Sequence, residues 1–222
     1  MVSRVLSIVL IDLVLSGDNA VVIGMAAHPL PRKQRRLAVL VGGGAAILLR
    51  ISLTGLAAFL LGLPALKAIG GLLLLWIAFK LLDATNADAS GPREAHTMRG
   101  AIMTILLADF VMSLDNVLGV AAASNGDFFL LIFGLGVSMA IVIFGGSVFA
   151  DLIDRLWWLA YLGAAVIAWT GVDMVQDDPL LASAGEVPFA LRLVINALVT
   201  LVVVGLAHRV YRHPTESRRS AG

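Results

Sequence analysis

The chain has 222 residues, of which 59% are hydrophobic and only 14% are charged, and its formal net charge is +1. A soluble domain carries about 25% charged residues, so this composition is typical of an integral membrane protein. The near-neutral charge, with the arginines in short loops, predicts no nucleic-acid partner. The sequence contains no cysteine, which excludes disulfides and thiolate metal centres.

Seven apolar runs are long enough to cross about 30 Å of hydrocarbon as α-helices. In chain order they are Val5–Ala27, Leu37–Leu61, Ala65–Leu82, Gly100–Ala123, Phe128–Phe149, Leu156–Val175 and Val187–Ala207. The first run is too long for a cleaved signal peptide and contains two aspartates, so we expect it to remain in the protein. The sequence therefore predicts an all-α integral membrane protein with seven transmembrane helices.

The first run is interrupted at its centre by the stretch DLVLSGDN, from Asp12 to Asn19. At about 100° per residue, the side chains of Asp12, Ser16 and Asn19 lie within about 60° of each other on a helix. Asp18 lies about 120° from Asp12 on the same helical projection. Asp18 therefore either faces a separate neighbour or lies where the helix unwinds, which Gly17 would permit.

The fourth run contains the same pattern in ADFVMSLDN, where Asp109, Ser113, Asp115 and Asn116 repeat the spacing of the first motif. Because three spans precede the second copy, that copy enters the membrane from the opposite face, as in the inverted repeats of secondary transporters. We therefore expect a 3+3 inverted repeat plus one C-terminal helix. Its parts are a first three-helix repeat at 1–82, a cytoplasmic linker at 83–99, an inverted second repeat at 100–175, a seventh helix at 187–207 and a cytoplasmic tail at 208–222.

The basic residues in the loops and near the ends of the apolar runs predict the orientation. Three lie on one side of the membrane, namely Arg4, Lys67 and Arg192. Twelve lie on the other side: Arg32, Lys33, Arg35, Arg36, Lys80, Arg93, Arg99, Arg155, Arg209, Arg212, Arg218 and Arg219. The positive-inside rule therefore predicts a multi-pass protein of the cell membrane with its N-terminus outside and its C-terminus in the cytoplasm.

The four motif aspartates need a compensating partner. Each Asp at the centre of a transmembrane helix costs about 2.5–3.5 kcal/mol on insertion scales, so these side chains must face the interior of the bundle. Carboxylate, carboxamide and hydroxyl oxygens suit hard divalent cations such as Mg²⁺, Ca²⁺ and Mn²⁺. The predicted metal site comprises Asp12, Ser16, Asp18, Asn19, Asp109, Ser113, Asp115 and Asn116. The structural alternative is a pair of polar helix–helix contacts.

For several other residues the sequence is compatible with either a functional or a structural role. Arg50, near the middle of the second run, either pairs with a motif aspartate, replaces the cation as a gating element, or forms a fixed ion pair. Met112 is either a soft ligand that favours Mn²⁺ or ordinary core filler. Asn196 could line a path or pack in the core. The outer loop with Asp177 and Asp178 could gather cations or be a solvated turn.

The paired D-x-x-x-S-x-D-N motifs, the 3+3+1 order of spans and the length resemble the TerC family, especially its short YjbE-like branch, within the LysE-like transporter superfamily. The resemblance covers residues 5–207. Several family members are implicated in Mn²⁺ export, and the family places acidic residues of the first and fourth spans at the metal site. Carried over, the resemblance implicates Asp12, Asp18, Asn19, Asp109, Asp115 and Asn116.

The sequence thus predicts a secondary transporter, not an enzyme, that exports Mn²⁺ or a similar divalent cation. The cation is a substrate, and no cofactor is expected. The expected partners are the lipid bilayer and the metal ion, and small-residue clusters such as Gly42–Gly44 also allow a homo-oligomer. Two alternatives remain open. One is an exporter of an amino acid or other small organic ion, and the other is an intramembrane aspartyl protease with two aspartates as acid and base.

Overall fold

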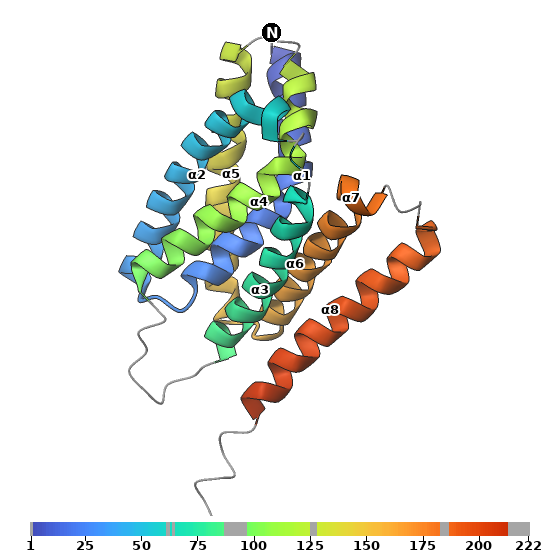
Figure 1. The fold of residues 1–222 in the computed structure, drawn as a ribbon. Helices are drawn as coiled ribbons and strands as arrows, with labels where there is room; N and C mark the ends of the chain where they lie inside the picture. The colour runs from blue at the N-terminus through green and yellow to red at the C-terminus, as the bar shows by residue number, and fades with distance from the viewer. Residues whose placement is uncertain are drawn as a thin grey trace, which may run out of the picture.

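The computed structural model describes residues 2–60, 63, 65–86, 97–124, 128–182 and 187–212, and this part of the chain is helical without strands. Figure 1 shows the arrangement of its helices. They are α1 (Val2–Ala27), α2 (Arg32–Leu60), α3 (Leu66–Asn86), α4 (Met98–Ser124), α5 (Phe128–Ile153), α6 (Trp158–Gln176), the short α7 (Pro179–Ala182) and α8 (Phe189–Arg212). The predicted all-α class is confirmed.

Six helices in the described part of the chain are long and apolar enough to cross a membrane: α1, α2, α3, α5, α6 and α8. The helix α4, with 27 residues, has the necessary length but is not one of these six helices of the described part of the chain. It carries the second motif. Seven spans in a 3+3 inverted repeat therefore stay a prediction.

Several helices extend beyond the apolar runs of the sequence. The helix α2 begins at Arg32, so the basic cluster between the first two apolar runs lies mainly on helix and not in a loop. Both ends of the predicted linker are also helical, because α3 continues to Asn86 and α4 begins at Met98. Lys, Arg and Gln are good helix formers, so an apolar run stops earlier than the helix that contains it. Residues 87–96 of the linker and 213–222 of the tail lie outside the described residues.

The long helices pair across the two halves of the chain. The helix α1 packs on α5 and crosses α4, while α4 packs on α2 and α3 packs on α6. Figure 1 shows α1 and α4 running in opposite directions. At the α3–α6 contact, Gly71 and Gly171 face each other so closely that a Cβ on either would overlap the carbonyl oxygen of the other. The two backbones therefore touch at this crossing.

The last helix, α8, lies at the edge of the bundle, where it contacts α6 and α3. Polar contacts tie it to α6: Asn196 donates a hydrogen bond to Asp173 (2.6 Å) and accepts one from Gln176 (2.5 Å). Near the other end of α8, the hydroxyl oxygen of Tyr161 on α6 lies 3.0 Å from Nδ1 of His208 on α8. Asn196 is therefore buried in a helix–helix contact.

The turn between α6 and α7 is held by the buried carboxylate of Asp178. Asp178 accepts hydrogen bonds from the backbone N–H groups of Ala68 and Leu180, both at 2.9 Å. Burial alone would raise the pKa of Asp178, but the backbone N–H groups of Ala68, Leu180, Ala65 and Lys67 together outweigh it and lower the pKa below its ordinary value. The interpretation of this segment as a solvated turn is therefore wrong for Asp178, because this side chain caps the start of α3. Asp177 is exposed and pairs with Arg192.

Candidate functional site

The two repeated motifs meet in the interior of the bundle, where α1 crosses α4. Asn19 of α1 donates a hydrogen bond to Asp109 Oδ1 of α4, at 3.1 Å. In return, Asn116 of α4 donates to Ser16 Oγ (3.2 Å) and to the carbonyl oxygen of Leu15 (3.0 Å) on α1. Each asparagine thus reaches across to the partner motif.

Within each motif the serine and the first aspartate make the same local contact. Ser16 Oγ donates to Asp12 Oδ1 at 3.2 Å, and Ser113 Oγ donates to Asp109 Oδ2 at 3.3 Å. Both pairs are four residues apart, which places the two side chains on one helix face. The spacing shared by the two motifs therefore produces two copies of one arrangement.

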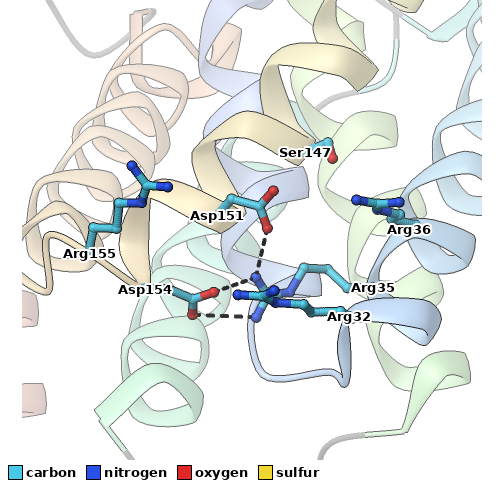
Figure 2. A pocket seen from close by; sticks show the side chains of 7 residues that line it. All are labelled: Arg32, Arg35, Arg36, Ser147, Asp151, Asp154 and Arg155. Atoms are coloured by element: carbon cyan, nitrogen blue, oxygen red, sulfur yellow. Dashed lines mark hydrogen bonds and ion pairs between the residues drawn. The ribbon is translucent and has the colours of Figure 1, made fainter.

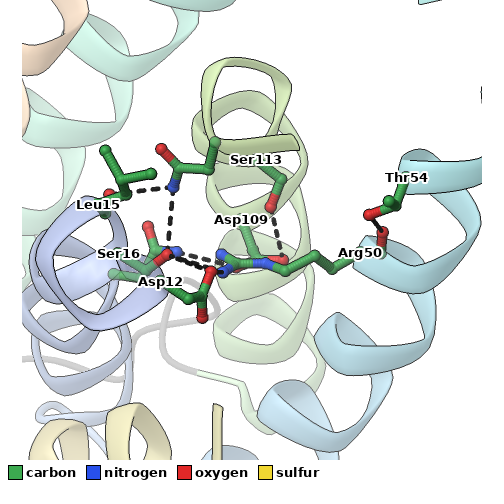
Figure 3. Close-up of polar contacts among 9 residues, drawn as sticks. Asp12, Leu15, Ser16, Arg50, Thr54, Asp109 and Ser113 are labelled. Carbon is green, nitrogen blue, oxygen red and sulfur yellow. Dashed lines mark hydrogen bonds and ion pairs between the residues drawn. The ribbon is translucent and has the colours of Figure 1, made fainter. Parts of the chain in front are cut away.

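Arg50 of α2 lies between the two aspartates (Figure 3). Its Nη1 donates to Asp12 Oδ1 at 2.9 Å and to Ser16 Oγ at 2.7 Å, and its Nη2 donates to Asp109 Oδ1 at 2.7 Å. All three charged side chains are buried, with exposed fractions of 2% for Arg50, 0% for Asp12 and 4% for Asp109. We call the side chains of Asp12, Ser16, Arg50 and Asp109 the arginine cluster.

The arginine cluster combines one cation with two carboxylates. Buried charges are tolerated when they are paired, and removing one partner leaves the other uncompensated. With both carboxylates ionised, the cluster carries an excess negative charge. Asp12 Oδ2 and Asn19 Oδ1 are also buried acceptors without a hydrogen-bond partner among the described residues. The charge and these acceptors both suit a cation or a proton.

Asp18 lies outside the arginine cluster. The helix α1 runs unbroken through Gly17, so the alternative of an unwound segment is wrong. Asp18 instead faces α6, where Thr170 Oγ1 donates to its Oδ2 at 3.4 Å. Its position follows from the helical angle of about 120° between Asp12 and Asp18. Asp18 Oδ1 has no hydrogen-bond partner in the described part of the chain.

Met112 and Asp115 are the two other predicted metal ligands on α4. Met112 is 3% exposed and belongs to the main apolar core, together with Ile105 and Ala108. Asp115 lies on α4, and its side chain is outside the described residues. Across the described ranges, no three His, Cys, Asp or Glu side chains lie close enough together to hold a metal ion.

Sequence reasoning missed Thr170, the partner of Asp18. A threonine in a transmembrane helix usually bonds the carbonyl oxygen four residues earlier, and Thr170 does donate to Val166 O at 3.1 Å. No residue pattern distinguishes it from an ordinary helix threonine, so only the packing of α6 against α1 shows its second contact.

These features define a helical membrane protein with a buried ion-pair cluster between α1, α2 and α4. The chain belongs to the integral membrane protein TerC family, whose profile matches residues 1–216. It is 40% identical to the uncharacterized membrane protein YjbE of Bacillus subtilis over 90% of this chain and 93% of that protein. The resemblance to the TerC family is confirmed.

Two further relatives are more distant. The chain is 30% identical to the uncharacterized membrane protein YceF of Bacillus subtilis, over 68% of this chain and 62% of that protein. It is 24% identical to the UPF0053 inner membrane protein YgdQ of Escherichia coli K12, over 78% of this chain and 79% of that protein. No solved structure matches the chain.

Proposed function

We propose that this TerC family protein is a secondary transporter that exports a divalent cation, Mn²⁺ first among the candidates. The observation that carries the proposal is the arginine cluster, in which carboxylates from two repeated motifs converge on one buried guanidinium. Both aspartates lie near the middle of their helices, at the depth where transporters bind their substrates. Oxygen donors of this kind suit hard divalent ions, and the preference for Mn²⁺ comes from the family resemblance.

In this proposal Arg50 acts as an internal counter-ion for Asp12 and Asp109. A divalent cation that binds these carboxylates competes with the guanidinium, because both positive groups need the same oxygens. Binding therefore moves Arg50 away from at least one aspartate. Return of Arg50 to that aspartate then helps to release the ion, and protons from the outside would have the same effect by neutralising a carboxylate.

The proposed direction of transport, export, comes from the family resemblance, and the proposed orientation of the chain identifies the two sides of the membrane. By the positive-inside rule, the excess of basic residues at one end of the helices supports a cytoplasmic location for that end. The relative YgdQ is named as an inner membrane protein, which supports a location in the cell membrane. The N-terminus then lies outside, and the cation moves from the cytoplasm to the exterior.

The two alternative functions find less support in the contacts of Arg50. An exporter of an amino acid would need a free guanidinium for the substrate carboxylate, but Arg50 already binds Asp12 and Asp109. An aspartyl protease needs two carboxylates that share a proton, whereas here a guanidinium separates them. The contacts of Arg50 therefore support a cation transporter over an amino-acid exporter or a protease.

Reconstitution of the purified protein in liposomes tests the proposal. We expect uptake of Mn²⁺ into vesicles that contain a metal-sensitive dye, with competition by other divalent ions and none by lysine or arginine. The Asp12→Asn and Asp109→Asn variants should lose this uptake. The matched control is Asp173→Asn, since Asp173 contacts α8 and lies outside the cluster. Wild-type rates in both cluster variants, or uptake of amino acids in place of metal ions, would contradict the proposal.

A further inference from the structure

A second polar site lies at the end of the bundle where α2 begins and where α5 turns into α6. It is a cavity of about 380 Å³. Its lining consists of charged and hydroxyl side chains, as Figure 2 shows: Arg32, Arg35, Arg36, Ser147, Asp151, Asp154 and Arg155. The arginine cluster described above shares none of these residues. We call this site the basic pocket.

Arg35 forms the fixed part of the basic pocket, and its side chain is only 8% exposed. Its Nη1 donates to Asp154 Oδ2 at 2.8 Å, to Asp151 Oδ1 at 3.1 Å and to Ala150 O at 3.3 Å. Its Nη2 donates to His28 O at 2.6 Å, and His28 Nε2 lies 2.8 Å from Asp154 Oδ1. The hydrogen bond from Arg35 lowers the pKa of Asp154, so this carboxylate stays ionised. Both acidic side chains of the pocket are thus engaged by Arg35.

Three further guanidinium groups remain. Arg32, Arg36 and Arg155 are exposed, and within the described residues they make no ion pair with a side chain. Four arginines against two aspartates leave the pocket with an excess positive charge. The hydroxyl of Ser147 adds a neutral donor to the lining. The pocket therefore favours an anion, because Arg35 pairs with both carboxylates and the four arginines still exceed the two aspartates in charge.

The depth of the pocket indicates where such an anion comes from. Candidate membrane spans begin at Arg32 and Trp158 and end at Ile153, so the pocket lies at the boundary of the hydrocarbon region. Trp157 and Trp158, beside the pocket, are 72% and 48% exposed. Exposed tryptophans of this kind are enriched at the level of the lipid headgroups. This end of the helices also carries the excess of basic residues, which places it at the cytoplasmic leaflet.

We propose that the basic pocket binds a phosphate anion, supplied at this depth by the headgroup of an anionic phospholipid. Guanidinium groups bind phosphate oxygens through paired, charge-assisted hydrogen bonds, which suits arginine better than lysine for this role. Basic pockets between transmembrane helices on the cytoplasmic side are recurrent sites for such headgroups. The bound phosphate offsets part of the positive charge of Arg32, Arg36 and Arg155 and joins the start of α2 to the α5–α6 turn.

Native mass spectrometry of the purified protein tests this site by titration with phosphatidylglycerol and with phosphatidylcholine. The test variant changes Arg32, Arg36 and Arg155 to glutamine and keeps the structural Arg35. We expect this variant to lose roughly a hundredfold in affinity for phosphatidylglycerol, because each basic side chain near an anionic surface contributes on the order of a factor of five. Affinity for phosphatidylcholine should be low in both proteins.

The matched control removes three charges from the same end of the molecule outside the pocket, through Lys33→Gln, Arg99→Gln and Arg209→Gln, all at exposed positions. It should retain phosphatidylglycerol binding within a few-fold. Equal losses of phosphatidylglycerol affinity in the test and control variants would mean that general surface charge causes the binding, and this would overturn the proposal. Unchanged affinity in the test variant would also overturn it. If the triple variant does not fold, Arg36→Glu alone replaces it, with Lys33→Glu as its control.

A further arm separates the two sources of phosphate. The protein in phosphatidylcholine nanodiscs is heated with and without millimolar inorganic phosphate, using sulfate-free buffer of equal ionic strength. Lipid as the ligand predicts stabilisation by phosphatidylglycerol and little by free phosphate. Equal stabilisation by free phosphate, lost in the test variant, would assign the pocket to a soluble phosphate and overturn the lipid source.

Discussion

Asn19 Nδ2 and Asp109 Oδ1 lie 3.1 Å apart, on helices α1 and α4 that belong to different copies of the motif. The contact from Asn116 to Ser16 has the reverse direction. Two copies of a pattern in one chain thus complete each other across a single crossing. This reciprocity explains why the motif carries an asparagine as well as an aspartate, since each asparagine supplies the donor that the opposite helix needs.

Arg50→Gln should destabilise the protein strongly. The substitution leaves Asp12 and Asp109 buried without their shared cation, and breaking one partner of a buried ion pair costs about 3–5 kcal/mol. Thermal unfolding in a mild detergent measures this loss. A larger decrease in melting temperature is expected for Arg50→Gln than for Arg192→Gln, which breaks an exposed pair with Asp177.

A double variant shows that the effect arises from the uncompensated carboxylates. Combining Arg50→Gln with Asp109→Asn removes one positive and one negative group together. The double variant should therefore unfold at a higher temperature than Arg50→Gln alone. Additive losses in the double variant would mean that Arg50 does not stabilise the ionised Asp109.

Substitution of Asp12 and of Asp18 should affect the stability of the protein to different extents, while both substitutions affect transport. Asp12→Asn disturbs the arginine cluster, whereas Asp18→Asn disturbs a single hydrogen bond from Thr170, worth about 1 kcal/mol. We therefore expect a near-normal melting temperature for Asp18→Asn and a lower one for Asp12→Asn. If the α6-facing carboxylate serves the ion on its way through the protein, Mn²⁺ uptake decreases in both variants.

Thr170→Val is the control for Asp18, because it removes the hydroxyl and keeps the size of the side chain. It should resemble Asp18→Asn in stability and the wild type in transport. A melting temperature of Asp18→Asn as low as that of Asp12→Asn would contradict the separation of the two sites.

The amino-acid pattern predicts on which face of its helix each motif residue lies, but it does not predict which residues of other helices that face contacts. Helical periodicity alone separates Asp18 from Asp12 and Ser16, because this separation depends only on the rotation per residue. The apolar run also places Arg50 at mid-span, but its partners depend on how α2 is rotated against α1 and α4, which no local pattern specifies. The role of Asp178 as a helix cap was hidden for the same reason, since its partner Ala68 is remote in sequence.

Gly71→Ala should be destabilising because of the close crossing of α3 and α6. A Cβ at this position overlaps the carbonyl oxygen of Gly171, so the two helices must separate. Overpacking of this kind costs about 1–3 kcal/mol. Gly44→Ala is the matched control, since its Cβ would meet no atom within 4 Å. Thermal unfolding of both variants should show a decrease for Gly71→Ala only, and equal melting temperatures would mean that the crossing is not tight.

Stability below pH 4 should depend on Asp178. Its pKa is lowered in the folded protein because backbone N–H groups, those of Ala68 and Leu180 foremost, together outweigh the effect of burial. A depressed pKa contributes stability above the unfolded value of about 3.9, and this contribution is lost as the pH falls through the folded pKa. The wild type should therefore lose stability below about pH 4 through protonation of Asp178.

Asp178→Ala removes this pH-dependent contribution together with the cap. Loss of a capping side chain costs about 0.5–2 kcal/mol, so the variant should be less stable than the wild type at pH 7. The difference between the two proteins should shrink as the pH falls below 4, because the wild-type carboxyl then becomes neutral. Melting temperatures across pH 3 to 7 measure this convergence. Asp177→Ala is the control, since Asp177 is exposed, and a difference that stays constant with pH would show that the charge of Asp178 does not stabilise the start of α3.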